Sequence, residues 1–181
     1  MQVQSSSHRT IRRLVLSAVC LALCMVLPFL TGQIPQVGSM LCPMHIPVLL
    51  AGFLCGPVWA LVVGAVAPML RYLLFSMPPP LPTGLAMTFE LLVYGLMSGL
   101  LYRLLPKKPR SVYIALIGAM LAGRVVWGFA STVIYGAMGK SFTWAVFFAG
   151  AFANAVPGII VHIILIPVLV FALQKAHIID K

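Results

Sequence analysis

The sequence predicts an all-α polytopic membrane protein with six transmembrane helices and both termini in the cytoplasm. Of its 181 residues, 62% are hydrophobic and only 8% are charged, whereas soluble domains are about 45–50% apolar and about 25% charged. A soluble fold of this length has too little interior to bury that much apolar surface. Several long, unbroken apolar runs indicate helices. The composition therefore excludes a soluble enzyme and a nucleic-acid-binding domain, although the net charge is +10.

The chain divides into a basic start, an apolar body and a short tail. Residues 1–13 are polar and basic and are expected to be a cytoplasmic N-terminal segment. Residues 14–175 are the expected six-helix membrane domain, and residues 176–181 the expected cytoplasmic tail. Because no small-residue cleavage site follows the first apolar run, we expect that run to be retained as a span rather than removed as a signal peptide.

Four apolar runs are long enough to cross a bilayer, which takes about 20 residues. They are Leu14–Leu30, Leu85–Leu105, Val112–Tyr135 and Phe142–Leu173. The stretch from His45 to Phe75 is ambiguous, because it fits either one long helix or two helices broken near Gly56-Pro57. A proline there removes a backbone donor and clashes with the preceding turn.

The distribution of basic residues decides between these alternatives. Nine of the twelve basic residues lie in three clusters, within residues 9–13, 103–110 and 175–181. The positive-inside rule places all three clusters in the cytoplasm. The N-terminus and the 103–110 loop share a side only if an even number of spans separates them, so residues 45–75 are predicted to cross twice. The alternative has five spans and puts the 103–110 loop outside.

Three loops are then predicted to face outward, at residues 31–44, 76–83 and 136–141. The first is long, and the second contains four prolines, which favour polyproline geometry. Two interpretations stay open for these loops: ordinary connectors, or a rigid lid over a site that opens outward.

Polar side chains at membrane depth are costly and usually face the interior of a helix bundle. Helical spacing places such side chains on one face of each of the last three spans. The three stripes are Thr83, Met87, Glu90 and Tyr94; Arg124, Trp127, Ser131 and Tyr135; and Asn154, Gly158 and His162. We expect the stripes to line one cavity beneath the outer loops. Such a cavity suits a small polar organic ligand with an anionic or strongly accepting group.

Glu90 is the only acid inside the apolar body, since the other, Asp180, is the penultimate residue. Its candidate partners are Arg71 and Arg124. A pair that only neutralises charge and a ligand-binding role for at least one member are both open, because a ligand can compete for an existing pair. His45 follows Cys42 closely, but no second cluster completes a metal site, so neither a metal nor another cofactor is predicted.

The chain contains no GxxxxGK[ST] nucleotide-binding motif and none of the common hydrolase or metalloprotease motifs. We therefore predict no catalytic residues and a binding subunit that depends on partners for energy. Ala18 and Ala22 form a small-xxx-small pattern on the first span, which lets helix backbones approach closely. Docking to a partner and a plain contact within the chain explain this pattern equally well.

With these features, the chain resembles the substrate-binding S components of energy-coupling factor (ECF) vitamin transporters. The resemblance covers nearly the whole chain and is most suggestive at residues 34–82, followed by TFELLVYG. It implies that the first outer loop, Gln33–His45, gates the substrate through residues such as Gln33, Gln36 and Ser39. It also implies that Ala18 and Ala22 are the docking motif, and that helices four to six supply binding residues.

The resemblance implies a high-affinity binding subunit of an ECF-type ABC importer in a bacterial plasma membrane. Its partners would be a small-molecule vitamin, a transmembrane scaffold subunit and two cytoplasmic ATPases. Arg124 favours a carboxylate-bearing vitamin such as pantothenate, and Glu90 favours an amine or hydroxyl, as in a pyridoxine-like or nucleoside-like ligand. The alternatives are a solo secondary transporter and an integral membrane enzyme or assembly factor. The full set of candidate binding residues is Glu90, Arg124, Asn154, Arg71, Trp127, Tyr94, Ser131 and His45.

Overall fold

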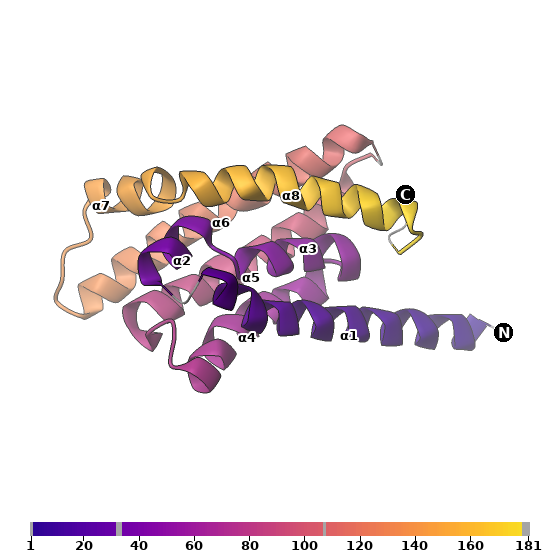
Figure 1. Ribbon diagram of the computed structural model, residues 1–181, viewed down its shortest axis with the longest axis horizontal. Coiled ribbons are helices and arrows are strands. Elements are labelled where there is room, and N and C mark those ends of the chain that lie inside the picture. The colour runs from indigo at the N-terminus through magenta and orange to yellow at the C-terminus, as the bar shows by residue number, and fades with distance from the viewer. Residues whose placement is uncertain (1, 32–33, 107, 179–181) are drawn as a thin grey trace.

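The computed structural model describes residues 2–31, 34–106 and 108–178, and these residues form helices and connecting loops with no strand (Figure 1). The α-helices are α1 (Gln2–Val26), α2 (Pro35–Leu41), α3 (His45–Cys55), α4 (Pro57–Phe75), α5 (Leu85–Leu104), α6 (Pro109–Ala137), α7 (Trp144–Phe148) and α8 (Val156–Lys175). The short segments are η1 (Leu27–Thr31), a 3-10 turn, and η2 (Pro80–Gly84) and η3 (Ala149–Ala153), both π-helical. The predicted all-α class is confirmed.

Within the described residues, five helical segments are long and apolar enough to cross a membrane, so the protein is a multi-pass membrane protein. They are His8–Leu30, Pro57–Phe75, Pro80–Leu104, Pro109–Ala137 and Trp144–Lys175. The apolar helix α3 has 11 residues, which at 1.5 Å per residue is about 17 Å, roughly half of a hydrocarbon core. The sixth crossing therefore depends on this short helix, and six spans remain a prediction.

The ambiguous stretch of residues 45–75 consists of two helices, as the charge argument required. Between α3 and α4 stands Gly56 with φ +89°, a backbone conformation that side-chain-bearing residues rarely adopt, and Pro57 starts α4. The basic residues within 9–13 lie in α1, which continues without a break into the first span.

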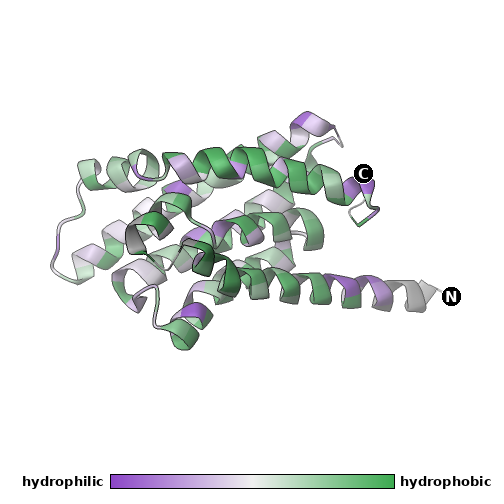
Figure 2. Ribbon diagram, viewed as in Figure 1, coloured by the Kyte–Doolittle hydropathy of each residue, from purple (hydrophilic) through white to green (hydrophobic). Residues whose placement is uncertain are grey.

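Both described ends of the chain and the α5–α6 connection lie at the same end of the bundle (Figure 1). Apolar residues follow α1 and α8 along most of their length, and hydrophilic residues gather towards this end (Figure 2). The described parts of the chain that carry the three basic clusters thus lie at one end of the bundle, which is the arrangement that the positive-inside rule predicts.

The core is built around α5, which packs against α3, α4 and α6. Two glycines let α4 and α5 approach closely. A Cβ atom at Gly95 would lie 2.3 Å from the Ala60 carbonyl oxygen, and one at Gly64 would lie 2.2 Å from the Leu91 carbonyl oxygen. Both contacts are with backbone carbonyl oxygens, which cannot rotate away as a side chain can. These contacts therefore fix the distance between α4 and α5.

We expect Gly95→Ala to lower stability by about 1–3 kcal/mol, because the added methyl group pushes α5 away from α4. Gly136→Ala in α6 is the matched control, since nothing lies within 4 Å of a Cβ atom there. Thermal unfolding in detergent, followed by size-exclusion chromatography, measures both. Equal melting temperatures for the two variants would contradict this account of the α4–α5 contact.

The outer connections are more structured than the sequence suggested. The 31–44 loop contains the helix α2, and in the proline-rich loop Pro79 has polyproline-like angles (φ −55°, ψ 138°) before the π-helical η2. The run Phe142–Leu173, expected as one span, is divided into α7, η3 and α8. The division falls just before Pro157 in the first turn of α8, where proline clashes with a preceding helical turn.

Candidate functional site

A buried ion pair joins α5 to α6. Oε1 of Glu90 lies 3.0 Å from Nη1 of Arg124, and the two residues are only 2% and 8% exposed. Arg124 is therefore the partner of Glu90. A carboxylate and a guanidinium enclosed together compensate each other's charge, which makes their burial tolerable at this depth.

Two aromatic side chains complete the surroundings of the Glu90 carboxylate. His45, the first residue of α3, places Nε2 3.5 Å from Oε2 of Glu90. Tyr94 lies one helical turn after Glu90, and its hydroxyl is a hydrogen-bond partner of the carboxylate. The rings of His45 and Tyr94 meet edge to face with centroids 5.3 Å apart. The carboxylate thus faces α3, α5 and α6 at once.

Cys42 and His162 extend this group to the outer loop and to α8. The His162 ring stacks on the His45 ring with centroids 6.1 Å apart and hydrogen-bonds to the backbone carbonyl of Cys42. The Cys42 sulfur lies 3.9 Å from Nη2 of Arg124. We call the six residues the buried polar cluster: Cys42, His45, Glu90, Tyr94, Arg124 and His162.

Several polar atoms of the buried polar cluster lack a hydrogen-bond partner. These atoms are Nδ1 and Nε2 of His45, Nε of Arg124, Nε2 of His162 and Oε1 of Glu90. The last is within ion-pair distance of Arg124 but without the alignment of a hydrogen bond. Buried polar groups are nearly always paired, because leaving them unpaired costs free energy. Five such atoms together mark a place where a polar molecule would gain hydrogen bonds.

The helix α2 covers the buried polar cluster and rests on α8. A Cβ atom at Gly158 of α8 would lie 2.5 Å from the Met40 carbonyl oxygen and 3.0 Å from that of Leu41. Cys42 ends α2 in a left-handed conformation (φ 48°, ψ 53°), and its amide donates to the Gly38 carbonyl at 2.9 Å. Because Gly158 has no side chain, the end of α2 packs closely on α8, beside the buried polar cluster.

Residues 12–170 match the family model of the substrate-specific component of ECF transporters. The chain belongs to this family. The match confirms the resemblance seen in the sequence and makes the chain a substrate-binding subunit of a transporter rather than an enzyme. Components of this family work with a scaffold and an ATPase module. No curated protein and no solved structure matches the chain.

In this ECF component, Arg71 lies apart from the Glu90 carboxylate. It is buried between the rings of Phe29 and Phe75, at 5.3 and 5.1 Å from their centroids, and donates to the Met25 backbone carbonyl. Arg71 thus ties α4 to the end of α1. Of the two candidate partners that the sequence offered for Glu90, Arg71 is therefore not the one that the fold brings to it.

Trp127 and Ser131 continue the stripe of α6 beyond Arg124, one and two turns away. Trp127 packs against the rings of Phe142 and Phe147, and Ser131 is buried.

Asn154 is exposed in the turn between η3 and α8, whereas Gly158 and His162 are buried. The break in helical geometry before α8 separates Asn154 from the face that its four-residue spacing predicted.

The proposed gating residues are only partly covered by the structure. Gln33 lies outside the described residues. Gln36 and Ser39 belong to α2, and for these two residues only the backbone is described. Cys42 and His162 were not among the sequence candidates for binding. His162 could have been chosen from the sequence, because it is an imidazole at membrane depth, four residues after Gly158. Its hydrogen-bond partner, the Cys42 carbonyl, is apparent only in the fold.

The described residues contain no group of three or more His, Cys, Asp and Glu side chains able to hold a metal ion. In particular, the His45 and His162 rings stack nearly parallel, at an interplanar angle of 19°. Their arrangement can bind a planar or hydrogen-bonding organic group, with Glu90 accepting and Arg124 donating.

Proposed function

We propose that this ECF component is a membrane-embedded, high-affinity subunit of an ABC-type importer in a bacterial plasma membrane. It captures a small water-soluble vitamin or related micronutrient from outside and delivers it through a scaffold subunit and two cytoplasmic ATPases. The observation that carries the proposal is the buried polar cluster, with its unpaired polar atoms directly beneath α2. Binding is non-covalent, and the chain makes or breaks no bond.

The donors and acceptors of the cluster define the ligand that fits it. The unpaired Nε of Arg124 suits a ligand with a carboxylate or another strong acceptor. The Glu90 carboxylate suits a hydroxyl or amine on the same ligand. A ligand carrying both kinds of group would open the Glu90–Arg124 pair and satisfy each member separately. Trp127, Ser131 and Asn154 stay candidates for contacts nearer the outer end.

The proposed orientation has six spans and both termini in the cytoplasm. It is supported by the described parts of the chain that carry the three basic clusters, which lie at one end of the bundle, whereas α2 lies towards the other end. In this orientation residues 1–13 and 176–181 are cytoplasmic and residues 14–175 form the membrane domain. A vitamin arriving from outside meets α2 first.

The proposed docking motif is accessible. Ala18 and Ala22 are exposed on α1, whereas Ser17, Cys20 and Cys24 face the interior. This exposure favours docking to a partner over a contact within the chain as the explanation of the small-residue pattern. A stripe of small residues on an exposed helix face suits close packing with a helix of the scaffold subunit.

Native mass spectrometry of gently purified protein tests the binding proposal. We expect a retained small molecule whose mass matches a vitamin or a related compound, at about one copy per chain. Uptake into proteoliposomes tests the energy source, and we expect it only when the scaffold and ATPases are present. Uptake that is undiminished without any ATPase would instead identify a solo secondary transporter.

We expect Gly158→Ala to speed the release of the bound molecule several-fold, because the added methyl group pushes the end of α2 away from α8. The obstacles are the Met40 and Leu41 carbonyl oxygens, which belong to the backbone and cannot rotate away. Gly136→Ala is again the control, since a methyl group there meets open space. Dilution followed by timed measurement of retained ligand gives the release rate. An unchanged rate would show that α2 is not the cover of the site.

A further inference from the structure

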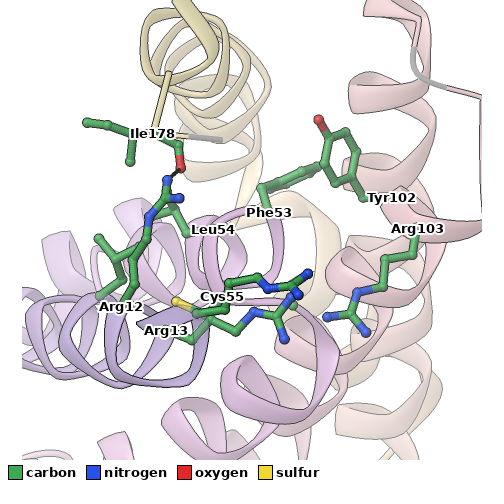
Figure 3. A pocket seen from close by; sticks show the side chains of 11 residues that line it. Arg12, Arg13, Phe53, Leu54, Cys55, Tyr102, Arg103 and Ile178 are labelled. Carbon is green, nitrogen blue, oxygen red and sulfur yellow. Dashed lines mark hydrogen bonds between the residues drawn. The ribbon is translucent and has the colours of Figure 1, made fainter. Parts of the chain in front are cut away.

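A second polar site lies at the end of the fold that carries both chain ends. It is a pocket of about 220 Å³ between the start of α1, the α3–α4 junction and the end of α5 (Figure 3). Four arginines line it, together with apolar side chains and Ile178 after α8. We call it the arginine pocket and define it by Arg9, Arg12, Arg13 and Arg103.

Contacts with the backbone hold two of these arginines in place. The Arg103 guanidinium packs on Gly56, where a Cβ atom would lie 2.1 Å from Nη2 and 2.8 Å from Cζ. Arg12 donates to the backbone carbonyl of Ile178. Arg13 of α1 and Arg103 at the end of α5 line the same pocket, and their side chains extend into it from opposite sides (Figure 3). The pocket is therefore assembled from three distant parts of the chain.

The positive charges of Arg13 and Arg103 are not matched by the described part of the chain. Its single carboxylate side chain is Glu90, which is engaged by Arg124 in the buried polar cluster. Like charges that converge without a counter-charge repel each other, and an anion between them removes this repulsion. The pair of guanidinium groups facing one pocket thus indicates an anionic ligand.

We propose that the arginine pocket binds the phosphate group of an anionic phospholipid at the cytoplasmic surface of the membrane. A guanidinium presents a planar fork of donors that matches phosphate oxygens, and basic pockets between membrane helices hold lipid head groups. The pocket also has an apolar side made by Leu16, Phe53 and Leu54.

Native mass spectrometry with added lipid tests this proposal on the full chain. Wild-type protein is titrated with phosphatidylglycerol and, separately, with phosphatidylcholine of the same acyl chains, and the pocket should prefer the anionic lipid. The double variant Arg13→Gln/Arg103→Gln should weaken phosphatidylglycerol binding by about 25-fold, at about fivefold for each arginine. The control Lys108→Gln/Arg110→Gln removes the same charge near the α5–α6 connection, outside the pocket, and should change binding less than about twofold.

Inorganic phosphate, added to the lipid-loaded protein, distinguishes the source of the phosphate group. We expect it to displace little lipid, because it brings no acyl chains. Complete displacement would assign the pocket to a soluble phosphate compound. Equal loss of lipid binding in both double variants would show that lipid is attracted by general surface charge and not by this pocket. Unchanged lipid binding with lost assembly of the ATPase-containing complex would assign the arginines to an acidic protein partner. Each of these three outcomes overturns the proposal, and none depends on whether the vitamin-like ligand is retained.

Discussion

Arg124→Gln is expected to weaken ligand binding by at least about 100-fold, because it removes the strongest donor of the buried polar cluster. It also leaves Glu90 with no guanidinium in an interior where that residue is 2% exposed. Removing one member of a buried charge pair costs about 3–5 kcal/mol, since the remaining charge is uncompensated. Ligand retained after purification and the melting temperature in detergent measure the two effects.

A double variant separates the loss of binding from the loss of folding. Glu90→Gln combined with Arg124→Gln removes both charges, so we expect most of the lost stability to return while binding stays weak. Arg71→Gln is the matched control, since Arg71 is also buried but contacts Phe29, Phe75 and the Met25 carbonyl instead. It should lower stability and leave the ligand bound. Ligand retained at normal affinity in the double variant would move the site away from Glu90 and Arg124.

Replacing Ala18 and Ala22 together by leucine is expected to reduce ATP-dependent uptake to background while ligand binding stays normal. Both side chains are exposed on α1, so the larger residues meet no neighbour within the chain. In a complex, the added volume would hold the scaffold helix several ångströms away and remove the close packing that small residues permit. Uptake into proteoliposomes with the complete transporter, alongside ligand retention by the isolated chain, measures the two expectations.

The control for this variant is Ala172→Leu, which adds the same side chain at an exposed position of α8. We expect it to transport normally. If Ala172→Leu fails equally, bulk on any lipid-facing helix is harmful and the docking assignment loses its support. If the α1 variant loses ligand as well as transport, the two alanines act on the fold rather than on a partner.

The helical segments could be predicted from the sequence almost completely, because apolar length is a local property. The run Leu85–Leu105 became α5, and the break expected near Gly56-Pro57 divides α3 from α4. Two details of local geometry, which hydrophobicity does not report, appear only in the structure. The loop at residues 31–44 contains α2, and the helical segment Trp144–Lys175, which is long and apolar enough to be one span, has an irregular turn before Pro157.

The candidate site was predictable in part. Glu90 and Arg124 were selected as charged groups at membrane depth, Tyr94 by its helical spacing from Glu90, and His45 as a binding candidate at the end of the first outer loop. The structure brings the four together. It places Arg71 among aromatic rings near the end of α1 instead. Asn154 was aligned with His162 by its spacing, and the irregular turn between η3 and α8 leaves it exposed. Helical spacing holds only while the helix continues, so no count of residues could have foreseen this.

By itself, the sequence determined that this is a helical membrane protein, where its helices run and which family it belongs to. These follow from hydrophobic length, from the placement of basic residues and from local motifs, which need no knowledge of the fold. Only the tertiary structure decided that Glu90 pairs with Arg124, and that Cys42 and His162 join them beneath α2. Those contacts depend on how far each helix is rotated and how closely it approaches its neighbours. Close backbone contacts at Gly95 and Gly158 set that geometry, between residues far apart in the chain.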